Sequence, residues 1–110
     1  MKKIVTSVKV PNDLDQQLSE AVIKDGYGMR GKSRWITEAI MAFLELDDFT
    51  QYVDIASEQS HLNKTLSFRM PTELAVRLDA AVIQVRKQYP LMEAARSNIV
   101  RASLFQHLLR

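Results

Sequence analysis

The polar residues best suited to binding chemistry lie on two short segments that alternate in character. Ser7 and Lys9 alternate with apolar residues in one segment, and Ser67 and Arg69 do so in the other. The serine hydroxyls can donate or accept hydrogen bonds, and the two cations can bind acceptors on an anionic partner. The sequence offers no paired carboxylates, no nucleophile with its base and no glycine-rich phosphate loop beside them. We therefore expect a binding protein and no enzyme.

Metal and thiol chemistry find little support in the sequence. The chain has no cysteine, which excludes disulfides and a thiolate metal site. Its two histidines, His61 and His107, are far apart and lack the spacing of a metal site. We expect no cofactor, no metal and no small-molecule substrate.

The distribution of charge favours a polyanionic partner. Residues 1–44 carry seven Lys/Arg and five Asp/Glu, residues 45–63 carry five Asp/Glu alone, and residues 64–110 carry eight Lys/Arg and three Asp/Glu. Basic flanks around an acidic middle suggest nucleic acid, although many basic proteins bind none. No apolar stretch approaches the roughly 18 residues of a membrane span, and the N-terminus lacks the apolar run of a signal peptide. We expect a cytoplasmic protein that binds no membrane.

The chain contains an internal repeat. At an offset of 60 residues Ala21-Val22-Ile23 matches Ala81-Val82-Ile83, and further on, at an offset of 64, Ser33 matches Ser97. Both blocks keep their spacing and residue character, which indicates a tandem repeat. We divide the chain into a first repeat, an acidic linker and a second repeat, at residues 1–46, 47–63 and 64–110. At 110 residues, the two repeats are expected to share one folded unit.

Each repeat begins with one predicted strand. Residues 6–10 and 66–70 alternate with period two, and each run ends at a proline. The apolar residues of both strands must share one face, and the serines and cations must share the other. A lone strand leaves its backbone groups unpaired, so we expect the two strands to pair in antiparallel orientation. Four helices would then cover the apolar face and leave the polar face bare.

Two predicted helices follow each strand. Asn12 and Thr72 are the expected N-caps of the first helix in each repeat, and the second helix is expected to begin at Ser33 or Ser97. Within the acidic linker, a short extra helix on the core is expected from the apolar residues Phe49, Tyr52, Val53 and Ile55.

With these elements in place, the sequence resembles the ribbon-helix-helix family of DNA-binding proteins, which includes the Arc and methionine repressors. The resemblance covers about residues 4–46 and 64–110. It rests on three motifs, each with a counterpart in the second repeat, namely Ser7-Val8-Lys9-Val10-Pro11, the Leu14/Leu18 helix, and Lys32-Ser33-Arg34. Two copies in one chain resemble the TraY-type accessory proteins of plasmid conjugation. The implied fold is mainly α with a two-stranded antiparallel β-ribbon, as a tandem pseudo-dimer.

The resemblance implies that this ribbon enters the major groove of double-stranded DNA. The base-reading residues would be the outward ones of both strands, Val5, Ser7, Lys9, Thr65, Ser67 and Arg69. Arg69 and Lys9 suit the acceptors of guanine, and Val5 or Thr65 could touch a thymine methyl group. The alternative is that these residues are only the solvated face of an amphipathic strand.

The resemblance also implies that the starts of the second helices bind the DNA backbone. The phosphate-binding residues would be Lys32, Ser33, Arg34, Arg96, Ser97 and Asn98. A helix N-terminus offers free amides and a positive dipole, although ordinary serine caps beside incidental charge would look the same. Trp35 is expected to be a half-buried core or interface residue, with stacking on nucleic acid as the alternative.

The leading hypothesis is a sequence-specific DNA-binding protein, either a transcriptional regulator such as an autorepressor or an accessory factor at a plasmid transfer origin. Lys9 is expected to face Arg69 and Val5 to face Thr65, so the recognition sequence need not be symmetric. Several molecules are expected to bind side by side on longer sites. The alternatives are an antitoxin, whose only segment for gripping a toxin would be the acidic linker, and a protein-interaction module of the same fold.

Overall fold

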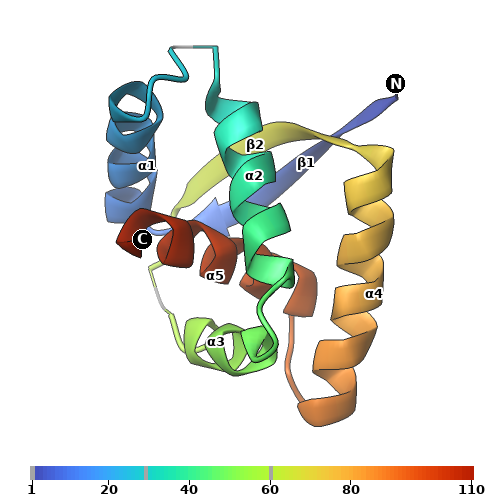
Figure 1. Ribbon diagram of the computed structural model, residues 1–110. Helices are drawn as coiled ribbons and strands as arrows, with labels where there is room; N and C mark the ends of the chain where they lie inside the picture. The colour runs from blue at the N-terminus through green and yellow to red at the C-terminus, as the bar shows by residue number, and fades with distance from the viewer. Residues whose placement is uncertain (1, 29, 60) are drawn as a thin grey trace.

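The structure, a computed structural model, describes residues 2–28, 30–59 and 61–110, and within them it contains one two-stranded sheet and five helices. In chain order the elements are β1 (Lys3–Val10), α1 (Asn12–Lys24), α2 (Lys32–Leu44), α3 (Phe49–Ala56), β2 (Lys64–Pro71), α4 (Thr72–Gln88) and α5 (Ala95–Leu109). Figure 1 shows α1 and α4 on opposite flanks of the molecule, with α2 and α5 crossing between them. The expected mainly helical fold with an antiparallel ribbon is confirmed.

The two strands pair with each other although more than fifty residues separate them. β1 and β2 are antiparallel, and Ser7 lies opposite Ser67. The apolar positions of both strands share the inner face and are buried, namely Val8, Val10, Leu66, Phe68 and Met70. The predicted pairing and the predicted inner face are therefore confirmed. Both strands begin earlier than the sequence pattern suggested, at Lys3 and Lys64.

The helices cover the inner face of the ribbon with their apolar sides. Each contributes large buried side chains, such as Leu14 and Leu18 from α1, Ile36 and Ile40 from α2, Leu74 and Leu78 from α4, and Ile99 and Leu104 from α5. Helix α5 contacts α2, α3, α4 and β1, and a run of residues from Asn98 to Leu104 is buried on it. It is thus the central helix of the fold.

The acidic segment after α2 carries a helix, α3, which covers part of α5. Phe49 and Val53 are buried, and the Phe49 ring packs edge-on against Phe43 at a centroid distance of 5.8 Å. Ile55 lies on the solvent side of α3, contrary to the expectation that it would pack on the core. The acidic side chains of this segment face solvent, while its apolar side completes the core.

The helix starts differ from the predicted caps. Asn12 and Thr72 are the first residues of α1 and α4, and the cap positions are held by Pro11 and Pro71 without a side-chain hydrogen bond. Each proline has an extended conformation, with ψ of 149° and 148°, so the helix begins at the residue directly after the proline. Pro11 alone separates β1 from α1, and Pro71 is the last residue of β2. Helices α2 and α5 begin one and two residues before their serines, so these serines lie in the first helical turn and are not the caps.

Trp35 belongs to the core, which leaves it no surface for stacking on nucleic acid. Its side chain is fully buried, its indole N–H donates to Asp25 Oδ2 at 2.8 Å, and its ring meets His107 edge-on at 4.7 Å. Arg110 Nη2 donates to the same oxygen of Asp25 at 2.6 Å. The hydrogen bond from the Trp35 indole lowers the pKa of Asp25. These contacts join the ends of α1 and α5 to the start of α2.

Acidification is expected to destabilise the fold through His107. Burial lowers the pKa of His107 below its ordinary value of 6.5, so the folded state favours the neutral ring. As the pH falls through that ordinary value, the unfolded chain gains a proton at His107 that the folded chain lacks, so the free energy of unfolding decreases. Urea unfolding at neutral and mildly acidic pH measures this effect. A His107→Phe variant should lose less stability over the same range, and an equal loss would place the effect on another residue.

Candidate nucleic-acid interface

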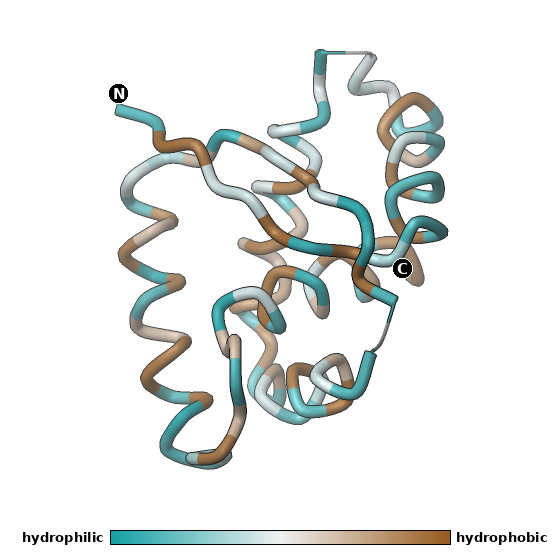
Figure 2. The backbone as a smooth tube through the Cα atoms, turned by 180° about the vertical axis from the view of Figure 1, so that it is seen from behind, coloured by the Kyte–Doolittle hydropathy of each residue, from teal (hydrophilic) through white to brown (hydrophobic). Residues whose placement is uncertain are grey.

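The outer face of the ribbon brings together all six residues predicted to read bases. Each of them has an exposed side chain, namely Val5, Ser7, Lys9, Thr65, Ser67 and Arg69. Figure 2, which views the molecule from the side opposite to Figure 1, shows the two strands in front of the helices. The helices pack on the inner face, so this outer face is left to solvent.

The register of the two strands corrects one prediction. Lys9 lies opposite Thr65, and Val5 lies opposite Arg69, so the expected facing of Lys9 with Arg69 is wrong. In an antiparallel pair centred on Ser7 and Ser67, a residue after one serine meets a residue before the other. The two cations therefore lie toward opposite ends of the face, and neither repels the other directly.

A pair of hydroxyl groups marks the centre of this face. Ser7 Oγ and Ser67 Oγ are 2.9 Å apart and share a hydrogen bond in which either can donate. Each hydroxyl keeps further capacity for a partner in solvent. Lys3 also lies on this face, opposite Pro71, and adds a third cation. The sequence analysis missed Lys3 because the predicted strand began at residue 6, although the same alternation continued backward would have found it.

Helix α2 holds the outer edge of β2 at Arg69. The backbone N–H of Arg69 donates to Ser33 Oγ at 3.0 Å, and the hydroxyl of Thr37 donates to the backbone oxygen of Arg69 at 3.4 Å. An edge strand has unpaired backbone groups, and here two side chains of one helix satisfy both groups of one residue. The backbone of Arg69 is thereby fixed while its side chain stays exposed.

Helix α5 holds the outer edge of β1 at Lys9. Arg101 Nη1 donates to the backbone oxygen of Lys9 at 2.8 Å, and Arg101 Nη2 donates to Asn98 Oδ1. Arg101 is only 4% exposed, and burial lowers its pKa. The sequence analysis missed the roles of Arg101 and Thr37, which occupy equivalent positions in the two repeats. Both residues position the ribbon, and neither belongs to its outer face.

One predicted phosphate-binding residue is wrong. Asn98 is only 3% exposed, its amide N–H donates to the backbone oxygen of Glu93 at 3.0 Å, and its oxygen accepts from Arg101. Helix α5 begins at Ala95, which turns Asn98 toward the core instead of solvent. Asn98 therefore supports Arg101 and cannot reach a phosphate group.

The other predicted phosphate-binding residues keep contact with solvent. Lys32, Ser33, Arg96 and Ser97 are partly exposed, and Arg34 is exposed. Two of the cations already have a carboxylate partner, since Arg34 bonds to Glu38 at 3.2 Å and Arg96 forms an ion pair with Asp79. Exposed ion pairs contribute little to stability, so exchanging the carboxylate for a phosphate would cost little.

Tyr27 contacts both residues of the ion pair between Arg34 and Glu38. Its hydroxyl donates to Glu38 Oε2, and this bond lowers the pKa of Glu38 and raises the pKa of Tyr27. The guanidinium of Arg34 also lies 5.6 Å from the centre of the Tyr27 ring. The loop after α1 is thus tied to the start of α2, beside the ribbon edge at Arg69.

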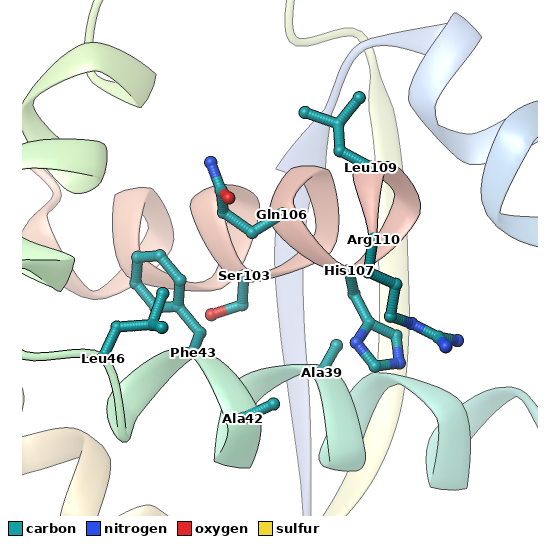
Figure 3. A pocket seen from close by; sticks show the side chains of 9 residues that line it. All are labelled: Ala39, Ala42, Phe43, Leu46, Ser103, Gln106, His107, Leu109 and Arg110. Atoms are coloured by element: carbon teal, nitrogen blue, oxygen red, sulfur yellow. The ribbon is translucent and has the colours of Figure 1, made fainter.

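A separate hollow lies between α2 and α5. It has a volume of about 270 Å³, and its lining side chains come from the two crossing helices, as Figure 3 shows. Ala39, Phe43 and His107 are among them, and the Nε2 atom of His107 is buried without a hydrogen-bond partner. None of the lining residues belongs to the outer face of the ribbon.

Residues 2–28, 30–59 and 61–110 hold no group of three His, Cys, Asp or Glu residues that could bind a metal, and none of the described helices has the length and apolarity to cross a membrane.

No protein-family model, curated protein or solved structure matches this chain.

Proposed function

We propose that the chain is a sequence-specific double-stranded DNA-binding protein of the ribbon-helix-helix type, with two repeats folded as a pseudo-dimer. The observation that carries the proposal is the outer face of the ribbon, where an exposed serine pair lies between Lys9 and Arg69 and no helix covers it. The order of elements supports the pseudo-dimer, because one strand and two helices precede α3 and one strand and two helices follow the acidic segment.

The ribbon suits the major groove in size and chemistry. Two paired strands lie about 4.8 Å apart, and the major groove is about 12 Å wide. Arg69 and Lys9 would donate to the O6 and N7 acceptors of guanine, and the serine hydroxyls would donate or accept at neighbouring bases. Because helices α2 and α5 hold the backbone at both cations, ordering of the backbone would not add to the cost of binding, which would come from the side chains themselves.

The helix starts would position the ribbon on the DNA backbone. Ser33 in the first turn of α2 contacts the edge of β2, and Arg101 in the second turn of α5 contacts the edge of β1, so the N-terminal halves of α2 and α5 flank the ribbon on its two sides. Lys32 and Arg34 on one side, and Arg96 on the other, would neutralise phosphates and carry no base information. These contacts would set how deeply the ribbon enters the groove and which base pairs it faces.

The two halves of the reading face differ, so one molecule would prefer an asymmetric sequence. Lys9 in the first strand corresponds to Arg69 in the second, and Val5 corresponds to Thr65. A protein of this kind could act as a transcriptional regulator, such as a repressor, or as an accessory factor at a plasmid transfer origin, since both roles require occupation of a defined DNA site.

Selection of bound duplexes from a random pool tests the proposal directly. We expect a defined sequence to emerge, and we expect methylation of guanine N7 within it to block binding, because N7 faces the major groove. Selection without any sequence preference would contradict sequence-specific binding. Protection confined to the minor groove would contradict the proposed docking of the ribbon.

Replacing Lys32 with alanine is expected to weaken binding to every duplex alike. Loss of one phosphate contact should reduce the slope of log affinity against log salt concentration by about 0.9. The control is Arg86→Ala, which removes one positive charge from an exposed position in the last turn of α4, the end of that helix far from the strand it follows. Titrations of both variants over a range of salt concentrations measure the slopes, and equal slopes for the two would remove Lys32 from the interface.

A further inference from the structure

Helix α4 presents a second, outer stripe of side chains on the side opposite its buried face. The buried face is formed by Leu74, Leu78, Ala81 and Val85. The α4 outer stripe is formed by Glu73, Val76, Ala80, Ile83 and Lys87, all of them exposed. Val76 is 68% exposed and Ile83 is 60% exposed, so two large apolar side chains face solvent on the same side of the helix.

The spacing of the α4 outer stripe is that of a helix-pairing surface. Its members are separated alternately by three and four residues, which keeps them on one side of a helix and is the pattern of coiled-coil contact positions. Figure 1 shows α4 at the edge of the molecule, with no other element on its outer side. Among the residues that the structure describes, the stripe is therefore exposed to solvent.

We propose that the α4 outer stripe binds the same stripe of a second copy of this chain, with the two helices antiparallel. Ala80 is the midpoint of the stripe, with Glu73 seven residues before it and Lys87 seven residues after it. If the twofold axis passes at Ala80, Glu73 of each copy lies opposite Lys87 of the other. The apolar residues Val76 and Ile83 then cover each other between the two ion pairs.

The local charges agree with this arrangement. Neither Glu73 nor Lys87 takes part in an ion pair among the described residues, so both are available to a second molecule. Asp79 lies near the axis and would meet its own copy, and its ion pair with Arg96 offsets that repulsion in the protein without DNA. The small side chain of Ala80 allows the helix axes to approach closely, at about 8 Å.

Helix α1 lacks an equivalent stripe, so the assembly closes at two copies. At the offset of 60 residues the first four positions correspond to Asp13, Gln16, Glu20 and Ile23, of which only Ile23 is apolar, and the fifth corresponds to Tyr27, beyond the end of α1. An interface that uses the same surface on both partners is closed by its own symmetry and leaves nothing for a third molecule. The fused chain would thus form pairs, with one ribbon contributed by each copy.

Disulfide trapping tests the pairing, because the protein has no cysteine of its own. In an Ala80→Cys variant the two thiols would lie near the twofold axis. The matched control is Glu20→Cys, the equivalent exposed position on α1. Under mild oxidation we expect Ala80→Cys to form covalent dimers roughly ten times faster than Glu20→Cys, because pairing raises the local thiol concentration. Each rate is divided by the rate at which the same thiol reacts with a small disulfide reagent.

Charge reversal tests the antiparallel register. Adding Glu73→Lys or Lys87→Glu to the Ala80→Cys protein should slow cross-linking, since each variant alone places like charges opposite each other. A mixture of the two variants should recover fast cross-linking between unlike molecules, which mass spectrometry distinguishes. Equal rates for Ala80→Cys and Glu20→Cys would overturn the pairing. A mixture that links no faster than each variant alone would overturn the antiparallel arrangement.

Discussion

Replacing Arg69 with alanine is expected to weaken binding to the selected DNA site by roughly 5- to 150-fold, which corresponds to about 1–3 kcal/mol. The loss arises because the guanidinium would make two hydrogen bonds to one guanine, and alanine makes none. Binding to an unrelated duplex should weaken much less, since base contacts contribute little there. Fluorescence anisotropy titrations with the selected and a scrambled duplex measure both losses.

The structure favours Arg69 over Lys9 as the dominant contact. Both the backbone N–H and the backbone oxygen of Arg69 are held by α2, whereas α5 holds the backbone oxygen of Lys9 through one hydrogen bond from Arg101. A lysine also offers a point charge where arginine offers a planar pair of donors. Lys9→Ala is therefore expected to lose less affinity than Arg69→Ala.

The matched control for Arg69 is Arg86→Ala, which removes the same charge from an exposed position in the last turn of α4. We expect this variant to bind both duplexes nearly as the original protein does. If Arg69→Ala weakened the two duplexes equally, Arg69 would be a phosphate contact. If it weakened neither, the outer face of the ribbon would not be the reading face.

The ribbon could be predicted from the sequence because its requirements are local and strict. Each strand alternates apolar and polar residues up to Pro11 or Pro71, and each repeat has only one such strand. Backbone groups that cannot be left unpaired then force the two strands together. Successive side chains of a strand point to opposite faces, so the position of a residue along the strand decides whether it is buried. Val8 and Phe68 were therefore correctly expected on the inner face.

The register of the two strands and the first residues of the helices could not be predicted from local sequence patterns. Alternation fixes which face a residue occupies but leaves open which residue lies opposite it, and so Lys9 was matched with Arg69 instead of Thr65. The serines were expected to cap α2 and α5, as serines often do. In the fold, Ser33 instead accepts a hydrogen bond from a strand distant in the sequence, a contact that no local pattern can reveal.

The burial of polar residues on α5 was the feature of the structure that was least predictable from the sequence. Arg101 corresponds to Thr37 in the repeat, and because charged residues are rarely buried, nothing in the sequence pointed to Arg101 as part of the core. Helix α5 contacts α1, α2, α3, α4 and β1, so it lies at the centre of the fold, and Asn98 and Arg101 are buried on it. Arg101 can be buried there because its guanidinium donates to the backbone of β1 and to Asn98, contacts between segments far apart in the sequence.

Truncating Arg101 to alanine is expected to lower the free energy of unfolding by about 2–5 kcal/mol. The change removes a buried side chain and leaves the backbone oxygen of Lys9 and Oδ1 of Asn98 without this donor. Urea denaturation followed by circular dichroism measures the loss. The equivalent change on the other edge, Thr37→Val, should cost less than about 1 kcal/mol, because its hydrogen bond is 3.4 Å long and one methyl group replaces one hydroxyl.

An Arg101→Met variant separates the contribution of buried volume from the contribution of the hydrogen bonds. Methionine keeps much of the buried volume and carries no charge, so it restores packing but not the two hydrogen bonds. Burial already lowers the pKa of Arg101, which means that the folded protein pays a desolvation cost for this cation. We expect the methionine variant to lie between alanine and the original protein in stability.

A methionine variant more stable than the original would show that the desolvation of the cation outweighs its hydrogen bonds. Arg101 would then serve to position Lys9, and its removal should weaken DNA binding while the fold becomes more stable.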